Sequence, residues 1–102
     1  MQLITKIVDE ADAAAASRLV CLSFRKLAAH DWEPHAQKVL LADSSPAAMR
    51  KKLWAATFAA GAFAGERMIG FVMMPRPGLL QMLFVHPRWL RRGVGRTLWE
   101  QA

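Results

Sequence analysis

Cysteine is almost absent from this sequence, in which Cys21 is the only one among 102 residues. A lone cysteine cannot form an internal disulfide, and such usage is typical of a reducing compartment, so we expect a cytoplasmic protein. For Cys21 itself we predict a small packing residue of the core. The three histidines show no zinc-ligand spacing with it, so the sequence predicts no metal site.

Long apolar runs are also missing. The longest nearly uncharged one, residues 53–65, is too short to cross a bilayer. The first ten residues, MQLITKIVDE, lack the continuous apolar stretch of a signal peptide. These absences argue against a membrane protein. Hydrophobic residues still make up 54% of the chain, which indicates one folded domain over residues 1–102 with a modest core.

Acidic residues are few. The 8 Asp and Glu residues face 14 Lys and Arg residues, and the net charge of +6 favours anionic partners such as phosphorylated cofactors or nucleic acid. Part of this charge is local, because four arginines lie within nine residues: Arg88, Arg91, Arg92 and Arg96.

Apolar periodicity, caps and turn residues predict the order of elements. We expect a strand over residues 2–8, a helix over 9–29, helical stretches over 34–42 and 45–53, strands over 57–64, 68–74 and 79–85, and a helix from about residue 93. Asp9 and Ser45 are the predicted N-caps, and residues 65–67 the predicted hairpin turn. This order predicts an α/β fold of mixed α+β type, with a largely antiparallel sheet flanked by helices.

The run LFVHPRWLRRGVGRTLW, residues 83–99, carries the clearest functional signal. An apolar strand stops before Pro87, a basic loop follows, and Gly93 and Gly95 open a helix with Val94, Leu98 and Trp99 on roughly one side. Glycine lets the backbone approach a ligand closely, and the first turn of a helix presents unpaired N–H groups. The run therefore predicts a site for a phosphorylated anion.

Other interpretations of this run are weaker. A dinucleotide fingerprint requires a third glycine where Leu98 stands, and a P-loop requires a lysine where Arg96 stands. A solvated basic helix start is one alternative. A nucleic-acid-binding surface, with Trp89 for stacking and Lys51 and Lys52 for added charge, is a less favoured one.

The same run resembles the acetyl-CoA-binding segment of the GNAT superfamily of N-acetyltransferases. That segment has a hydrophobic strand, V-x-P, a short loop, Q/R-x-x-G-x-G/A and a helix. The matching positions are Leu83, Val85, Pro87, Gly93 and Gly95, whereas Leu90 falls where the family has Gln or Arg. Because the family fold continues past this helix, the resemblance implies the N-terminal two-thirds of a GNAT domain, truncated at its C-terminus.

The resemblance implies an acetyl-CoA-dependent transfer of an acetyl group to an amine of a small molecule or peptide. Backbone groups of the strand would pair with the pantetheine arm, and those of the loop and helix start would hold the pyrophosphate. The expected cofactor-binding residues are Leu83, Phe84, Val85, Arg91, Arg92, Gly93, Val94, Gly95 and Arg96.

Catalytic residues are less visible. There is no tyrosine, and the candidates for a general base are Asp31, Glu33 and His35, in the loop that borders the acceptor site in the family. Solvation or helix capping is the alternative role for each. For His86, beside the cofactor loop, we predict a structural role.

The strand at residues 79–85 would form an exposed apolar edge if no further strand covered it. We therefore expect a homo-oligomer formed through this edge, or by exchange of the last helix. A catalytically inactive interaction module is the corresponding alternative function.

Overall fold

The computed structural model describes residues 3–27, 31–76, 79–80 and 82–101. The elements in chain order are β1 (Leu3–Ile7), the 3-10 turn η1 (Glu10–Asp12), α1 (Ala13–Leu27), α2 (Pro34–Asp43), α3 (Pro46–Ala55), β2 (Phe58–Ala64), β3 (Arg67–Met74), β4 (Met82–Val85), the 3-10 turn η3 (Pro87–Trp89) and α4 (Val94–Gln101).

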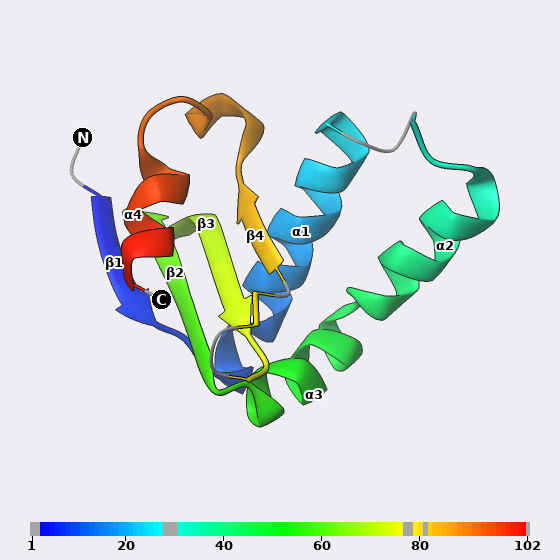
Figure 1. Cartoon of the computed structure of the whole chain (residues 1–102), viewed down its shortest axis with the longest axis horizontal. Helices are drawn as coiled ribbons and strands as arrows, with labels where there is room; N and C mark the ends of the chain where they lie inside the picture. Colours follow the sequence, from blue (N-terminus) through cyan, green and yellow to red (C-terminus); the bar gives the residue numbers. More distant parts are fainter. Residues whose placement is uncertain (1–2, 28–30, 77–78, 81, 102) are drawn as a thin grey trace.

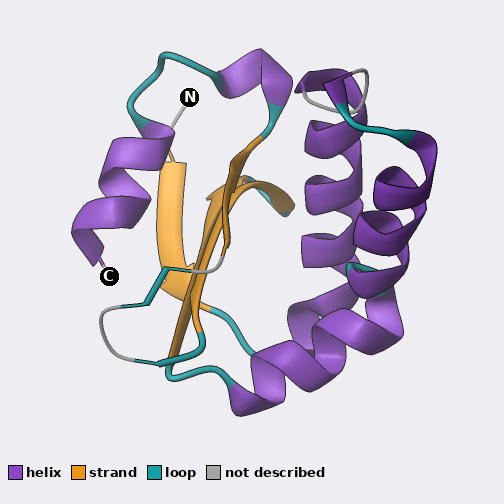
Figure 2. Ribbon diagram, turned by 45° about the vertical axis from the view of Figure 1, so that its right-hand side comes forward, coloured by secondary structure: helices purple, strands orange, loops and turns teal. Residues whose placement is uncertain are grey.

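The four strands form one sheet in the order β1-β2-β3-β4, and each neighbouring pair is antiparallel (Figure 1). Helices α1, α2 and α3 lie on one side of this sheet and α4 lies on the other (Figure 2). The predicted fold class, a mixed α/β fold with an antiparallel sheet flanked by helices, is confirmed. No helix in the described ranges is long and apolar enough to cross a membrane.

Two apolar clusters fill the two faces of the sheet. Val20, Met49 and Phe71 belong to the cluster beneath α1 and α3. Ile69 and Leu98 belong to the cluster beneath α4. Both faces of β2 and β3 are therefore buried, which explains why these strands read as nearly continuous apolar runs instead of alternating ones.

Gly70 lies next to a β-bulge in β3 and faces α4. Ala62 lies opposite Gly70 but Phe63 lies opposite Met68, so Ile69 is the extra residue. A Cβ built on Gly70 would lie 2.7 Å from Val94 Cγ1. Gly70 is therefore the position at which the start of α4 contacts the backbone of the sheet.

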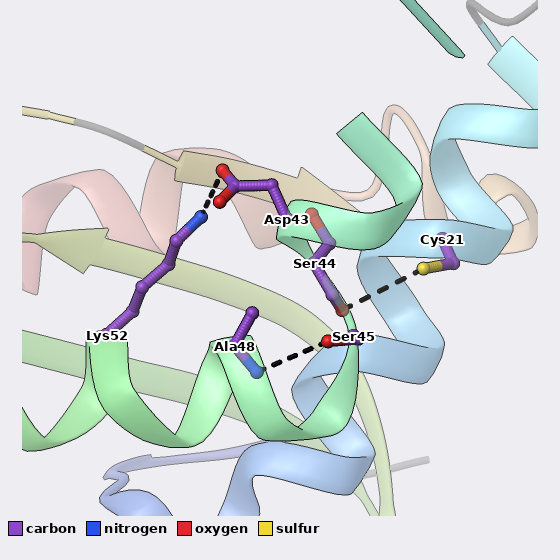
Figure 3. Close-up of polar contacts among 6 residues, drawn as sticks. All are labelled: Cys21, Asp43, Ser44, Ser45, Ala48 and Lys52. Atoms are coloured by element: carbon purple, nitrogen blue, oxygen red, sulfur yellow. Dashed lines mark hydrogen bonds and ion pairs between the residues drawn. The ribbon is translucent and has the colours of Figure 1, made fainter. Parts of the chain in front are cut away.

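The predicted caps and hairpin turn are present. Asp9 accepts a hydrogen bond from the Ala11 N–H at 2.9 Å. Ser45 Oγ accepts one from the Ala48 N–H at 3.2 Å (Figure 3). Gly65, in the hairpin turn, has a φ of +64°, a conformation that favours glycine. The local chemistry that predicted these three element boundaries is thus the chemistry that forms them.

Cys21 lies where α1 meets the junction of α2 and α3 (Figure 3). It is half-buried, not enclosed in the core as predicted, and its Sγ lies 3.9 Å from the Ser44 carbonyl oxygen. Close by, Lys52 of α3 forms an ion pair with Asp43 at the end of α2, at 2.6 Å. These contacts connect the three helices on this side of the sheet.

Two expectations at the end of the chain are corrected. β4 begins at Met82 instead of residue 79, because the Leu79 N–H donates to the Arg76 carbonyl at 3.1 Å and closes a turn instead of joining β3. Trp99 is 55% exposed, so of the three residues predicted to share one side of α4 only Val94 and Leu98 are buried. The expectations for residues 2, 28–30 and 81 lie outside the described residues.

Candidate functional site

A groove of about 340 Å³ runs along the free edge of β4. β4 is the last strand in the sheet order, so β3 lies on one side of it and the groove on the other. The groove is lined by residues of α1, of β4, of the following loop and of the start of α4: Ser23, Phe24, Leu83, Phe84, Val85, Leu90 and Gly95. Four of the predicted cofactor-binding residues therefore meet at one concave surface.

The backbone of β4 presents hydrogen-bonding groups to this groove. The His86 N–H donates to the Ile69 carbonyl of β3 at 2.8 Å. Because successive residues of a strand direct their backbone groups to opposite sides, the peptide groups of Leu83 and Val85 point to the open edge. An extended ligand lying in the groove can pair with them as an added strand does.

The loop after β4 contains two residues with left-handed backbones, Arg91 at φ 63° and Gly93 at φ 80°. The Gly93 carbonyl accepts from the Thr97 N–H at 3.0 Å and from Thr97 Oγ1 at 2.9 Å, so Gly93 caps the start of α4. The first N–H groups of α4 have no acceptor within the helix. A Cβ built on Gly93 would meet no atom within 4 Å. Space is therefore open above a helix start that favours anions.

The four arginines of this segment, at positions 88, 91 and 92 in the loop and 96 in α4, are all exposed. The Arg92 guanidinium lies over the Trp89 ring, 5.3 Å from its centroid, and Arg96 forms an exposed ion pair with Glu100 at 3.4 Å. Their charges raise the positive potential around the helix start.

His86 connects the end of β4 to this loop. Its ring is nearly buried, its Nδ1 accepts from the Arg88 N–H at 3.1 Å, and its Nε2 lies 3.2 Å from an Arg67 guanidinium nitrogen. Burial, followed by the charges of Arg67 and Arg88, lowers the pKa of His86. The neutral ring therefore caps the turn η3, in keeping with the predicted structural role.

The three candidate bases lie in or next to the first turn of α2. Glu33 Oε1 accepts from the Ala36 N–H at 2.5 Å and so caps α2, while Asp31 and His35 are exposed. Between them, Trp32 packs edge-on against Phe24 at 5.1 Å between ring centroids. Because Phe24 lines the groove, this segment borders the site, and a catalytic role for any of the three stays a prediction.

Three residues of the groove were not among those predicted from the sequence. Phe24 and Ser23 were not singled out, and Leu90 was noted only as the residue at the position where the family has Gln or Arg. The available signal for Ser23 was its position on the apolar stripe of α1, between Val20 and Phe24, where a serine hydroxyl must find a partner.

A sequence profile described as an acetyltransferase (GNAT) domain matches residues 27–102. The chain belongs to the GNAT acetyltransferase family. The matched range contains β2 to α4, and therefore the β4 edge, the basic loop and the helix start. Acetyl-CoA is the cofactor of this family, as the resemblance implied, and acetyl transfer is its general reaction.

Solved structures of other proteins share the fold. The PaiA N-acetyltransferase from Thermoplasma acidophilum, in complex with coenzyme A, superposes with a TM-score of 0.83 at 16% identity over 99% of this chain and 69% of that one. A GCN5-related N-acetyltransferase from Rhodopseudomonas palustris gives 0.83 at 24% identity, over 99% of this chain and 63% of that one. The apo form of YjaB from Escherichia coli superposes with a TM-score of 0.72 at 20% identity, over 99% of this chain and 64% of that one.

The GNAT chain described here thus spans 63% to 69% of the length of these three proteins. Among curated proteins, no sequence matches it.

Proposed function

We propose that this GNAT chain binds acetyl-CoA in the groove along β4 and that the reaction it serves is acetyl transfer to an amine. One observation carries the proposal: the strand and the glycine helix start of the GNAT segment, which are separated by the basic loop, line the same groove through Leu83, Val85 and Gly95. A long extended arm ending in phosphates matches a groove that begins at a strand edge and ends at a helix N-terminus.

Each part of the site has an assigned role. The peptide groups of Leu83 and Val85 pair with the amides of the pantetheine arm, with Phe84 between them. The N–H groups of Val94, Gly95 and Arg96, reached over Gly93, hold the pyrophosphate, while Arg91 and Arg92 add positive charge. When bound, acetyl-CoA supplies the acetyl group as a thioester.

The acceptor is an amine of a small molecule or peptide, which enters beside the segment that packs on Phe24. Asp31, Glu33 and His35 are the candidates for the general base, and the Glu33 carboxylate also caps α2. We assign cofactor binding to this chain and leave acetyl transfer as a separate property to be measured.

The free edge of β4 supports one further proposal, pairing of two copies of the chain. Leu79, Leu80 and Leu83 are large apolar residues that remain exposed at or before this edge. Unpaired strand edges readily accept another strand. Since the same edge holds the pantetheine arm, cofactor and second copy compete for it.

The direct test of cofactor binding is a calorimetric titration with acetyl-CoA of the wild-type chain and of Gly93→Glu and Gly95→Glu. Each variant places a side chain and a negative charge where the phosphates bind, so we expect micromolar wild-type affinity to be lost in both. Gly65→Glu is the matched control for Gly93→Glu, since Gly65 also has a positive φ and a Cβ built there would meet no atom within 4 Å.

Unaltered binding in both site variants, or no binding by folded wild-type chain, would contradict the proposal. A titration against salt separates the nucleic-acid alternative, because affinity for a polyanion falls steeply with ionic strength across many phosphates. If only nucleic acid binds, and with that steep slope, the basic loop serves that alternative function.

A further inference from the structure

Ser23 is a buried polar residue at the wall of the groove. It is 1% exposed, and among the described residues that line the groove it is the only one with a polar side chain. Its hydroxyl donates to the Val85 carbonyl oxygen at 3.2 Å. This is one of the backbone groups that β4 turns toward its open edge.

The choice of partner is informative. A serine inside a helix can donate to a carbonyl of its own preceding turn, and that local bond is always within reach. Ser23 instead bonds 62 residues away, to the last residue of β4. The bond connects α1 to the strand edge where the chain leaves the sheet.

The end of β4 is consequently held from both sides. On the inner side, the His86 N–H donates to Ile69 of β3 at 2.8 Å. On the outer side, Ser23 holds the Val85 carbonyl. The peptide that joins Val85 to His86 is thus fixed in orientation without any further strand. A carbonyl oxygen has two lone pairs, so the bond from Ser23 leaves one acceptor site for a ligand.

We propose that Ser23 is a positioning residue for the pantetheine arm: it orients the Val85 carbonyl so that its free acceptor site receives the N–H of a secondary amide of the extended arm. This inference rests on the proposed binding of the cofactor along β4. Ser23 acts on the arm alone, because the phosphates lie at the start of α4.

The separation between arm and phosphates provides the test. Coenzyme A contains both, whereas adenosine 3′,5′-bisphosphate keeps the nucleotide with one phosphate of the pyrophosphate and lacks the arm. Calorimetric titration of both ligands into the full chain gives two affinities for each variant, and the change in their ratio from wild type to variant reports the effect of Ser23 on the arm. A role of Ser23 in stability alone would not change this ratio.

We expect Ser23→Ala to lower coenzyme A affinity about three- to tenfold, the loss of one hydrogen bond, and to leave adenosine 3′,5′-bisphosphate affinity unchanged. Ser23→Cys, which keeps a weak donor of similar size, should lie between the two. Ser17→Ala is the matched control: Ser17 is a buried serine of the same helix and is not among the residues that line the groove. Thermal unfolding of each variant confirms that it is folded.

Equal losses for both ligands in Ser23→Ala, or no loss for either, would overturn the inference while leaving the proposed function intact. Wild-type chain that binds adenosine 3′,5′-bisphosphate as tightly as coenzyme A would also overturn it, because the arm then contributes nothing. If folded wild-type chain binds neither ligand, the proposed function fails and the inference with it.

Discussion

At the scale of single residues, His86 combines a structural bond with a titratable ring. Its pKa is lowered by burial and by Arg67 and Arg88, so between that lowered value and its ordinary value of 6.5 the folded chain binds fewer protons than the unfolded chain. The free energy of unfolding should therefore be highest above pH 6.5 and should fall as the pH decreases through this window.

His86→Asn keeps an acceptor at the cap of η3 but removes the titration. In urea denaturation from about pH 7.5 to about pH 5, the variant should lose less stability than the wild type as the pH falls. Parallel profiles for the two proteins would show that the pKa of His86 is the same in the folded and the unfolded chain, and would contradict this account.

The two glycines of the site make different demands on the backbone. Gly93 has a φ of +80°, so Gly93→Ala should destabilise the chain by about 1 kcal/mol in urea denaturation. A Cβ on Gly95 would lie 3.6 Å from Val85 Cγ2, an ordinary contact, so Gly95→Ala should leave stability nearly unchanged. Because Gly95 lines the groove, its alanine variant should still weaken binding of acetyl-CoA. A stable Gly93→Ala chain would contradict this account of the loop.

At the scale of elements, the contact of α4 with the sheet depends on Gly70. A Cβ there would lie 2.7 Å from Val94 Cγ1 and 2.8 Å from Leu98 Cδ1. Gly70→Ala should therefore cost about 1–3 kcal/mol by overpacking, and it should weaken acetyl-CoA binding because the start of α4 is displaced.

The same clash predicts that substitutions in β3 and α4 have non-additive effects on stability. Leu98→Ala removes one of the two side chains that a Cβ at position 70 would meet. In denaturant titrations, the double variant Gly70→Ala/Leu98→Ala should therefore lose less stability than the sum of the single losses. Additive losses would mean that α4 does not need glycine at this position.

At the scale of the whole molecule, we expect self-association that the cofactor reverses. If two copies pair through β4, sedimentation velocity should show a concentration-dependent dimer, and saturating acetyl-CoA should shift it toward monomer. Leu83→Lys, which places a charge at the exposed edge, should give monomer without cofactor. A monomer at all concentrations, or a dimer unaffected by both changes, would exclude this interface.

The sequence predicted most of the fold because its boundaries are local. Ser45 and Gly65 specify a cap and a turn through contacts within a few residues, and the structure shows both. The predicted start of β4 was wrong because the apolar residues Leu79 and Leu80 match the pattern of a strand. In the structure, the Leu79 N–H donates to the Arg76 carbonyl instead. Local pattern cannot distinguish these two outcomes.

Only the part of the candidate site that lies in one continuous segment could be predicted from the sequence. The loop and helix start follow from one continuous motif, whereas the opposite wall of the groove comes from α1, about sixty residues earlier. The bond from Ser23 to Val85 is a tertiary contact that leaves no spacing to read. Its only trace in the sequence is a serine among apolar neighbours on α1.

Because the groove combines the first long helix with the last, it exists only when nearly the whole chain is folded. Any molecule that fills it binds the folded state and not the unfolded one, so occupancy and stability are linked. At a free ligand concentration of about 100 times the dissociation constant, this linkage adds about 2.7 kcal/mol to the free energy of unfolding. The melting temperature of this chain should therefore report how fully the surrounding solution supplies its cofactor.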